Sequence, residues 1–266
     1  MTDTWGIAAA VATSASALFV AWQAGETRRS TNISQHALTS SQAVALDAAR
    51  GRLDDQAPQV EVHLTPETAW PPLGPSAGWP QPWPPAQEWH FPRDEDTLLA
   101  LRVTVHVTNH SDRPVHATFE GDLYHPYVEG ADRPTRMDRR LLLDPGQSVA
   151  ADLRKHFPLK DWAENHRAYT EETGDRPAQA LALVRVHDDR DNGVIDSWEL
   201  ALSGAPIQPD PERAGVWRLT PPMPDESALR CVDFELQPPR VRTYWLSRSK
   251  NMPLPEPAYP PALRAL

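Results

Sequence analysis

The amino-acid sequence predicts a mainly β protein, in which an N-terminal helical region precedes an antiparallel β domain. Three observations lead to this fold class. A charge-free apolar run extends from Trp5 to Trp22, a proline-free stretch rich in helix formers follows, and short segments with period-two alternation then fill most of the chain. We therefore expect a membrane anchor over residues 1–25, a helical stalk over 26–55 and a β domain over 56–250.

The apolar run has the length of a membrane-spanning helix. At about 1.5 Å of rise per residue, a helix from Trp5 to Trp22 is about 27 Å long, close to the hydrocarbon thickness of about 30 Å. Its two terminal tryptophans suit the headgroup boundary. A cleaved secretory signal and a buried soluble helix are the alternatives, but the run has no basic residue before it and no small-residue cleavage site at its end.

Charges beside the run predict its orientation. Arg28 and Arg29 follow the run and Asp3 precedes it, and basic residues are retained on the cytoplasmic side. We therefore expect a single-pass protein of the cell membrane with its N-terminus outside and its β domain in the cytoplasm. The single cysteine, Cys231, forms no intrachain disulfide, which is compatible with that compartment.

The stretch at residues 26–55 predicts a helical stalk, with disorder as the alternative. It contains no proline, but Ser40 and Gln42 interrupt any heptad, so a sustained coiled coil is not expected. Within the anchor, Ala8 and Ala12 repeat small residues at four-residue spacing, which lets two helices approach closely. A homodimer through the anchor or the stalk is therefore a further expectation.

The net charge limits the kinds of partner. The chain carries −10 at pH 7, so general electrostatic attraction to nucleic acid is not expected. The expected partners are the membrane, through residues 5–22, and an unidentified protein.

Alternating segments predict the strands of the β domain. The clearest segment is Leu99–Val107, in which Leu and Val alternate with more polar residues, as in an antiparallel sheet with one wet face. Further strands are expected at residues 60–64, 115–119, 141–143, 149–153, 182–186, 198–202, 215–219, 232–236 and 241–246.

Residues 97–155 resemble the immunoglobulin-like β-sandwiches of bacterial surface and membrane proteins. The resemblance rests on a strand ending Val107-Thr108-Asn109 before a polar turn, and on the turn from Leu143 to Ser148 (LDPGQS) before another strand. It implies an immunoglobulin-like antiparallel β-sandwich, a fold that hosts many functions.

A segment rich in proline and tryptophan, residues 69–92, interrupts the strands. Proline blocks both helix and ladder pairing, so we expect extended chain or loop here. Two interpretations remain open: the tryptophans pack against the domain's own sheet, or the segment docks a protein partner. In the second case the candidate partner-binding residues are Trp79, Pro82, Trp83 and Pro85.

One short helix is expected within the β domain, at residues 159–173. Trp162, His166 and Tyr169 fall on one stripe, and Gly174 suits the end of the helix. We interpret His166 as a packed residue of that face. The proline-rich tail, residues 251–266, is expected to be untethered.

The segment Asp188–Glu199 (DDRDNGVIDSWE) is the one motif that could carry chemistry. It resembles the calcium loop of helix–loop–helix proteins, with Asp188, Asn192, Asp196 and Glu199 at ligand positions, and this resemblance implies a calcium site. Arg190 departs from the motif, because it stands where an oxygen ligand is required, and strands rather than helices are expected on both sides.

A β-hairpin accounts for the same segment without a metal. If Asp191-Asn192-Gly193 is a three-residue loop, Val186 faces Trp198 and apolar residues pair with apolar residues. The hairpin needs no cofactor, whereas the alternative needs calcium.

The function expected from these observations is that of a membrane-tethered, non-enzymatic interaction or scaffold module. No catalytic motif is present, so no catalytic residue is named. A calcium-binding envelope module using residues 188–199 is the alternative. In its layout of short anchor, stalk and β-sandwich, the chain resembles uncharacterised single-pass membrane proteins of actinobacteria, and this resemblance implies no activity.

Overall fold

A computed structural model describes residues 3–66, 73–75, 84, 86–126, 134–137, 139–172, 176–221 and 232–258. The chain forms two compact units. One unit comprises Met1–Asp55 with Pro253–Leu266, and the other comprises Gln56–Met252.

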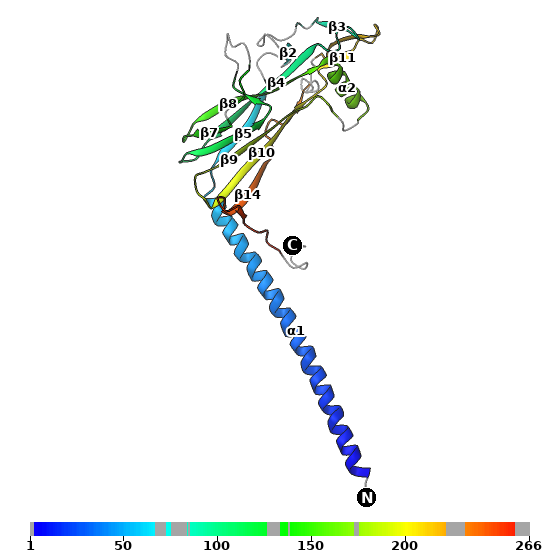
Figure 1. The fold of residues 1–266 in the computed structure, drawn as a ribbon, viewed down its shortest axis with the longest axis vertical. Helices are drawn as coiled ribbons and strands as arrows, with labels where there is room; N and C mark the ends of the chain where they lie inside the picture. The colour runs from blue at the N-terminus through cyan, green and yellow to red at the C-terminus, as the bar shows by residue number, and fades with distance from the viewer. Residues whose placement is uncertain are drawn as a thin grey trace. The chain divides into compact units, whose positions relative to one another are not determined.

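The first unit is built on one helix, α1 (Asp3–Asp55), which covers both the predicted anchor and the predicted stalk (Figure 1). Within the described part of the chain, no helix combines the length and the apolar character needed to cross a membrane. The side chains of residues 3–21 lie outside the described residues, so the anchor stays a prediction. In the tail, the Pro255 carbonyl accepts a hydrogen bond from Arg50 Nη2 at 3.3 Å.

The second unit is mainly β, and its strand pairs between described residues are antiparallel, as the sequence predicts. A five-stranded sheet has the order β1-β4-β8-β6, with β2 also pairing with β4. Its strands are β1 (Val60–Pro66), β2 (Leu73–Pro75), β4 (Leu98–Asn109), β6 (Leu123–Tyr124) and β8 (Ser148–Pro158).

A seven-stranded sheet forms the second layer, in the order β15-β14-β10-β9-β5-β7, with β13 also pairing with β10. Its strands are β5 (Val115–Gly121), β7 (Arg140–Leu143), β9 (Ala180–His187), β10 (Gly193–Ser203), β13 (Asp233–Phe234), β14 (Arg240–Ser247) and β15 (Met252–Pro253). A small sheet contains β3 (Glu88–His90), β11 (Ile207–Pro209) and β12 (Val216–Leu219).

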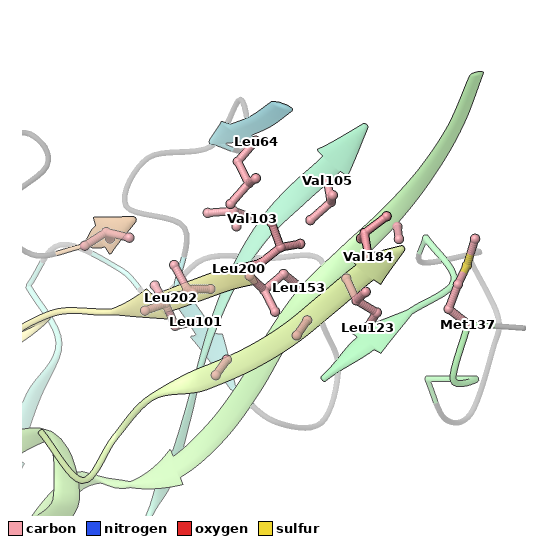
Figure 2. Close-up of a cluster of buried hydrophobic side chains, with 14 of the residues drawn as sticks. Leu64, Leu101, Val103, Val105, Leu123, Met137, Leu153, Val184, Leu200 and Leu202 are labelled. Atoms are coloured by element: carbon pink, nitrogen blue, oxygen red, sulfur yellow. The ribbon is translucent and has the colours of Figure 1, made fainter. Parts of the chain in front are cut away.

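The hydrophobic core lies between the two large sheets (Figure 2). Val103 and Leu153 enter it from the five-stranded sheet, and Val184 and Leu200 enter it from the seven-stranded sheet. Each of these side chains is at most 2% exposed. Burying such a side chain stabilises the folded state by about 1.5–3 kcal/mol relative to leaving it in water. The period-two alternation therefore arises because one face of each sheet is packed.

The predicted short helix is α2 (Leu159–Thr170). Trp162 is buried and its Nε1 donates to the Leu99 carbonyl at 3.0 Å. His166 lies against the Trp217 ring, with 6.0 Å between ring centroids, as expected of a packed residue. The left-handed residue after the helix is Glu172, with φ 55°, and Gly174 lies outside the described residues.

The register of the β9–β10 hairpin differs from the prediction. Asp196 lies opposite Val186, and Trp198 lies opposite Val184, so the pairing is shifted by two residues. The predicted three-residue loop is wrong, because β9 ends at His187 and β10 begins at Gly193. The carboxylates of Asp188 and Asp191 bind other groups within this longer connection and beyond it. A two-residue shift leaves every side chain on its predicted face.

The proline- and tryptophan-rich segment is described only in part. Trp89 on β3 is 3% exposed and belongs to the core, opposite Trp217 on β12. This tryptophan follows the packed interpretation. The candidate partner-binding residues lie outside the described residues: Trp79, Pro82, Trp83 and Pro85.

Candidate functional site

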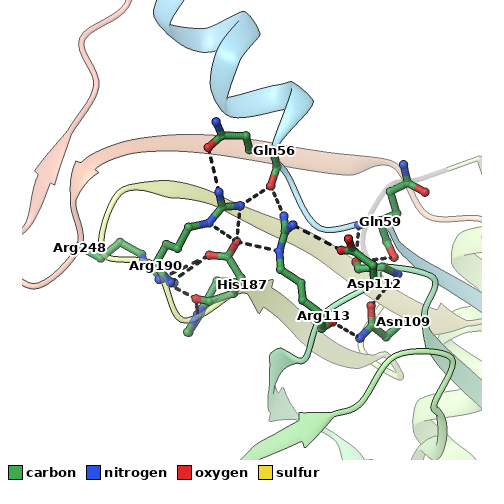
Figure 3. Close-up of polar contacts among 10 residues, drawn as sticks. Gln56, Gln59, Asn109, Asp112, Arg113, His187, Arg190 and Arg248 are labelled. Atoms are coloured by element: carbon green, nitrogen blue, oxygen red, sulfur yellow. Dashed lines mark hydrogen bonds and ion pairs between the residues drawn. The ribbon is translucent and has the colours of Figure 1, made fainter.

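Asp188 lies in the loop that follows β9, at the centre of a polar network whose arginines are labelled in Figure 3. The residue is 3% exposed, and its Oδ2 accepts hydrogen bonds from Arg190 Nε at 2.9 Å and Nη2 at 2.7 Å. The same oxygen lies 3.3 Å from Arg113 Nε, and Oδ1 lies 3.9 Å from Arg248 Nη2. Three guanidinium groups therefore surround one buried carboxylate.

Asp191 fixes the other end of the same loop. Ser247 Oγ donates to Asp191 Oδ2 at 2.6 Å, and the Ser249 amide donates to Oδ1 at 2.7 Å. The Ser247 hydroxyl and the Ser249 donors hold the pKa of Asp191 down at about 2, so this carboxylate is charged at neutral pH. These contacts join the loop to the end of β14.

The network also binds Gln56, the first residue of the second unit, which is called the β unit from here on. Arg190 Nη1 donates to Gln56 Oε1 at 2.8 Å, and guanidinium groups of Arg113 and Arg190 both donate to the Gln56 carbonyl (Figure 3). A carboxylate occupied by guanidinium groups is a poor general base. The arrangement therefore has a structural role: it connects loops that are distant in sequence.

The structure places the four predicted calcium ligands in different surroundings. Asn192 is exposed, and Asp196 on β10 accepts two hydrogen bonds from Arg242, at 2.7 and 2.6 Å. Glu199 lines a depression of about 400 Å³ near Asp233. Over the described ranges, no group of three or more His, Cys, Asp or Glu side chains could hold a metal ion. The calcium site stays a prediction.

A second candidate is the side of the seven-stranded sheet that faces away from the core, here called the outer sheet face. It carries three aliphatic side chains that are more than half exposed. Leu142 on β7 is 52% exposed, Leu181 on β9 is 53% exposed and Val241 on β14 is 55% exposed. Their cross-strand partners, His116, Ala201 and Ser197, face outward as well. The face is therefore open and carries apolar groups on three strands.

Polar groups lie between these aliphatic side chains. Arg185 Nη1 donates to Glu120 Oε1 at 2.8 Å, and both side chains are partly exposed. The rings of His116 and His187 lie 5.4 Å apart, and His116 is bonded to Asp189. Apolar anchors among satisfied polar groups are typical of surfaces that bind proteins reversibly.

One feature of the sequence indicates this exposed apolar face, although the strand prediction from alternating residues did not include it. Residues 180–184 (ALALV) form a continuous apolar run instead of an alternating one. Ala180, Ala182 and Val184 point into the core, so Leu181 must point outward. A single exposed apolar residue is normal on a protein surface, so Leu181 is informative only together with the exposed Leu142 and Val241 on the same sheet face.

Comparison with known proteins adds no relative. No protein-family model matches this chain. No significant similarity links it to a curated protein or to a solved structure.

Proposed function

We propose that this protein is a non-enzymatic interaction module that binds a protein partner through its outer sheet face. The observation that carries the proposal is the exposure of Leu142, Leu181 and Val241 on one side of the seven-stranded sheet. Burying an exposed aliphatic side chain under a partner favours binding by roughly 25 cal/mol per Å² of apolar surface. The loss of translational and rotational freedom on association opposes this gain.

The strand order supports an immunoglobulin-like sandwich for this module. In such folds the first, second and fifth strands form one sheet, and the third, sixth and seventh form the other. Here β1, β4 and β8 are neighbours in one sheet, and β5, β9 and β10 are neighbours in the other. The outer sheet face then corresponds to a broad sheet face, which a partner can cover without disturbing the core.

The second part of the proposal is a membrane tether. The run Trp5–Trp22 is free of charged residues, and Arg28 and Arg29 follow it. These features favour an anchor with the β unit on the cytoplasmic side. An interaction module held there would concentrate its partner at the membrane.

Site-specific photo-crosslinking of the full-length protein in a bacterial host tests the binding face. A photoreactive amino acid replaces Leu181 or Val241, and Glu164 on α2, which is also exposed, serves as the control position. We expect both face positions to crosslink the same polypeptide and the control to give no such product. Val241→Asp should reduce crosslinking from position 181 at least tenfold. Equal crosslinking from Glu164, or none from the face, would overturn the proposal.

Membrane fractionation tests the tether. The full chain should stay in the membrane pellet after an alkaline carbonate wash, and a chain starting at residue 26 should be released. A reporter fused to the C-terminus should report the cytoplasm. Release of the full chain by carbonate would contradict the membrane anchor. An exterior reporter signal would show that Arg28 and Arg29 do not set the orientation.

A further inference from the structure

Two arginines face each other on the outer side of the five-stranded sheet. Arg102 on β4 and Arg154 on β8 are direct cross-strand partners, while the adjacent Val103 and Leu153 belong to the core. The two arginines are only 6% and 5% exposed. Like charges directly opposite each other destabilise a sheet, and buried charges need a compensating partner.

The compensation is different for the two arginines. Arg102 Nη1 lies 3.2 Å from Oδ2 of Asp152, which is 3% exposed. Across the part of the chain that the structure describes, the guanidinium of Arg154 takes part in no hydrogen bond or ion pair. Burial lowers the pKa of Arg154, yet its guanidinium stays charged at neutral pH. The Asp152 carboxylate attracts this cation through space, but the N–H donors of Arg154 are bonded to none of the described residues.

An aromatic ring holds this cation in place. The Cζ atom of Arg154 lies 5.5 Å from the Tyr124 ring centroid, and Cζ of Arg136 lies 5.8 Å from the same centroid. A cation–π contact orients the guanidinium plane and uses none of its five N–H donors. Arg154 is therefore positioned before any ligand arrives, with a second guanidinium at the same ring.

We propose that Arg154, with Arg102 and Arg136 beside it, forms a binding site for a small oxyanion such as a phosphate or carboxylate group. The guanidinium fork matches the paired oxygens of these groups, and low solvent exposure strengthens the contact. The chain as a whole carries −10, so this local positive charge is not a consequence of a basic surface. The site lies on the five-stranded sheet and is separate from the outer sheet face.

Calorimetric titration of the full chain with phosphate and, separately, with acetate tests the site, in sodium chloride of matched ionic strength. We expect binding with one site per chain and an accompanying rise in Tm. Arg154→Gln should weaken binding at least tenfold, and Arg154→Lys, which keeps the charge but loses the fork, should weaken it less. Binding of phosphate alone identifies a tetrahedral oxyanion, and binding of acetate alone identifies a carboxylate; either result supports the site.

A matched control separates the site from a general salt effect. Arg185→Gln removes an arginine from the other sheet, where Arg185 pairs with Glu120, and should leave anion binding unchanged. If Arg154→Gln does not fold, Arg154→Lys supplies the comparison. Equal stabilisation of wild type and the Arg154 variants, or no binding of either anion by wild type, would overturn the proposal.

Discussion

Asp188 Oδ2 lies 3.3 Å from Arg113 Nε, and this ion pair joins the loop after β9 to the turn between β4 and β5. The carboxylate is buried, whereas the guanidinium is about one third exposed. Because Arg190 and Arg248 approach the same carboxylate, its charge balances several cations at once. The stability of this end of the domain therefore depends on one acidic side chain.

Asp188→Ala should lower the free energy of unfolding by about 3 kcal/mol, because it leaves guanidinium groups without their shared buried partner. Urea denaturation monitored by circular dichroism measures the change. Asp189→Asn is the matched control, since Asp189 is mostly exposed and its loss should cost less than about 1 kcal/mol. Equal effects of the two substitutions would contradict the role given to Asp188.

Calcium addition tests the metal-binding prediction on the same loop. We expect no calcium-dependent rise in Tm, because the Asp188 carboxylate is occupied by guanidinium groups and Asp196 is bonded to Arg242. A rise that appears in wild type and disappears in both Asp188→Ala and Asn192→Ala would instead support a calcium site.

Asn165 provides a second test of a buried polar network. Its Nδ2 donates to the carbonyls of Ala178 and Gly204, both at 2.9 Å, and its Oδ1 accepts from the Ala178 amide at 3.0 Å. Asn165→Ala should cost about 2–4 kcal/mol, because it leaves buried backbone groups without partners at about 1–3 kcal/mol each. The exposed neighbour Glu164, changed to Ala, should change stability by less than about 0.5 kcal/mol in the same urea titration.

The sequence predicted the longer strands and the short helix, but not the hairpin register. It also missed β2 and β3, which form ladder pairs inside residues 69–92, where extended chain or loop was expected. Pairing Val186 with Trp198 and pairing it with Asp196 both leave the apolar side chains on the core face, so alternation cannot choose between them. The choice depends on Asp188 and Asp191, whose partners lie on β14 and in the turn after β4. Contacts between such distant segments leave no local pattern.

Alternation also misjudged one face. The polar positions of Leu99–Val107 predict a wet side of the sheet, yet Arg102 on that side is 6% exposed. Periodicity reports which residues share a face, and not what covers that face. The arginine pair with Arg154 was therefore not visible before β8 was placed beside β4.

Two glycines with positive φ should differ in their tolerance of a methyl group. A Cβ at Gly121 (φ 90°) would lie 2.3 Å from the Leu181 carbonyl oxygen, whereas a Cβ at Gly146 (φ 73°) would meet nothing within 4 Å. Gly146→Ala should cost about 1–2 kcal/mol, the penalty of left-handed backbone. Gly121→Ala adds a backbone clash and should cost clearly more, measured as the difference in Tm. Equal losses would contradict the close approach of β5 and β9.

Acid should destabilise the β unit as histidines begin to titrate. Burial lowers the pKa of His106, His156, His166 and His187 below the ordinary 6.5. Below that pH the unfolded chain binds protons that the folded chain does not, so the free energy of unfolding should fall as the pH drops from about 7 to about 5.

His166→Phe isolates one contribution to this pH dependence. Phenylalanine keeps an aromatic ring beside Trp217 and removes the titrating group, so the slope of stability against pH should decrease. Wild type is the reference, and its slope is measured over the same range, from about pH 5 to about pH 7. Urea titrations at several pH values measure both slopes. A steeper slope in His166→Phe would mean that the folded state favours the protonated imidazole, against the direction that burial imposes.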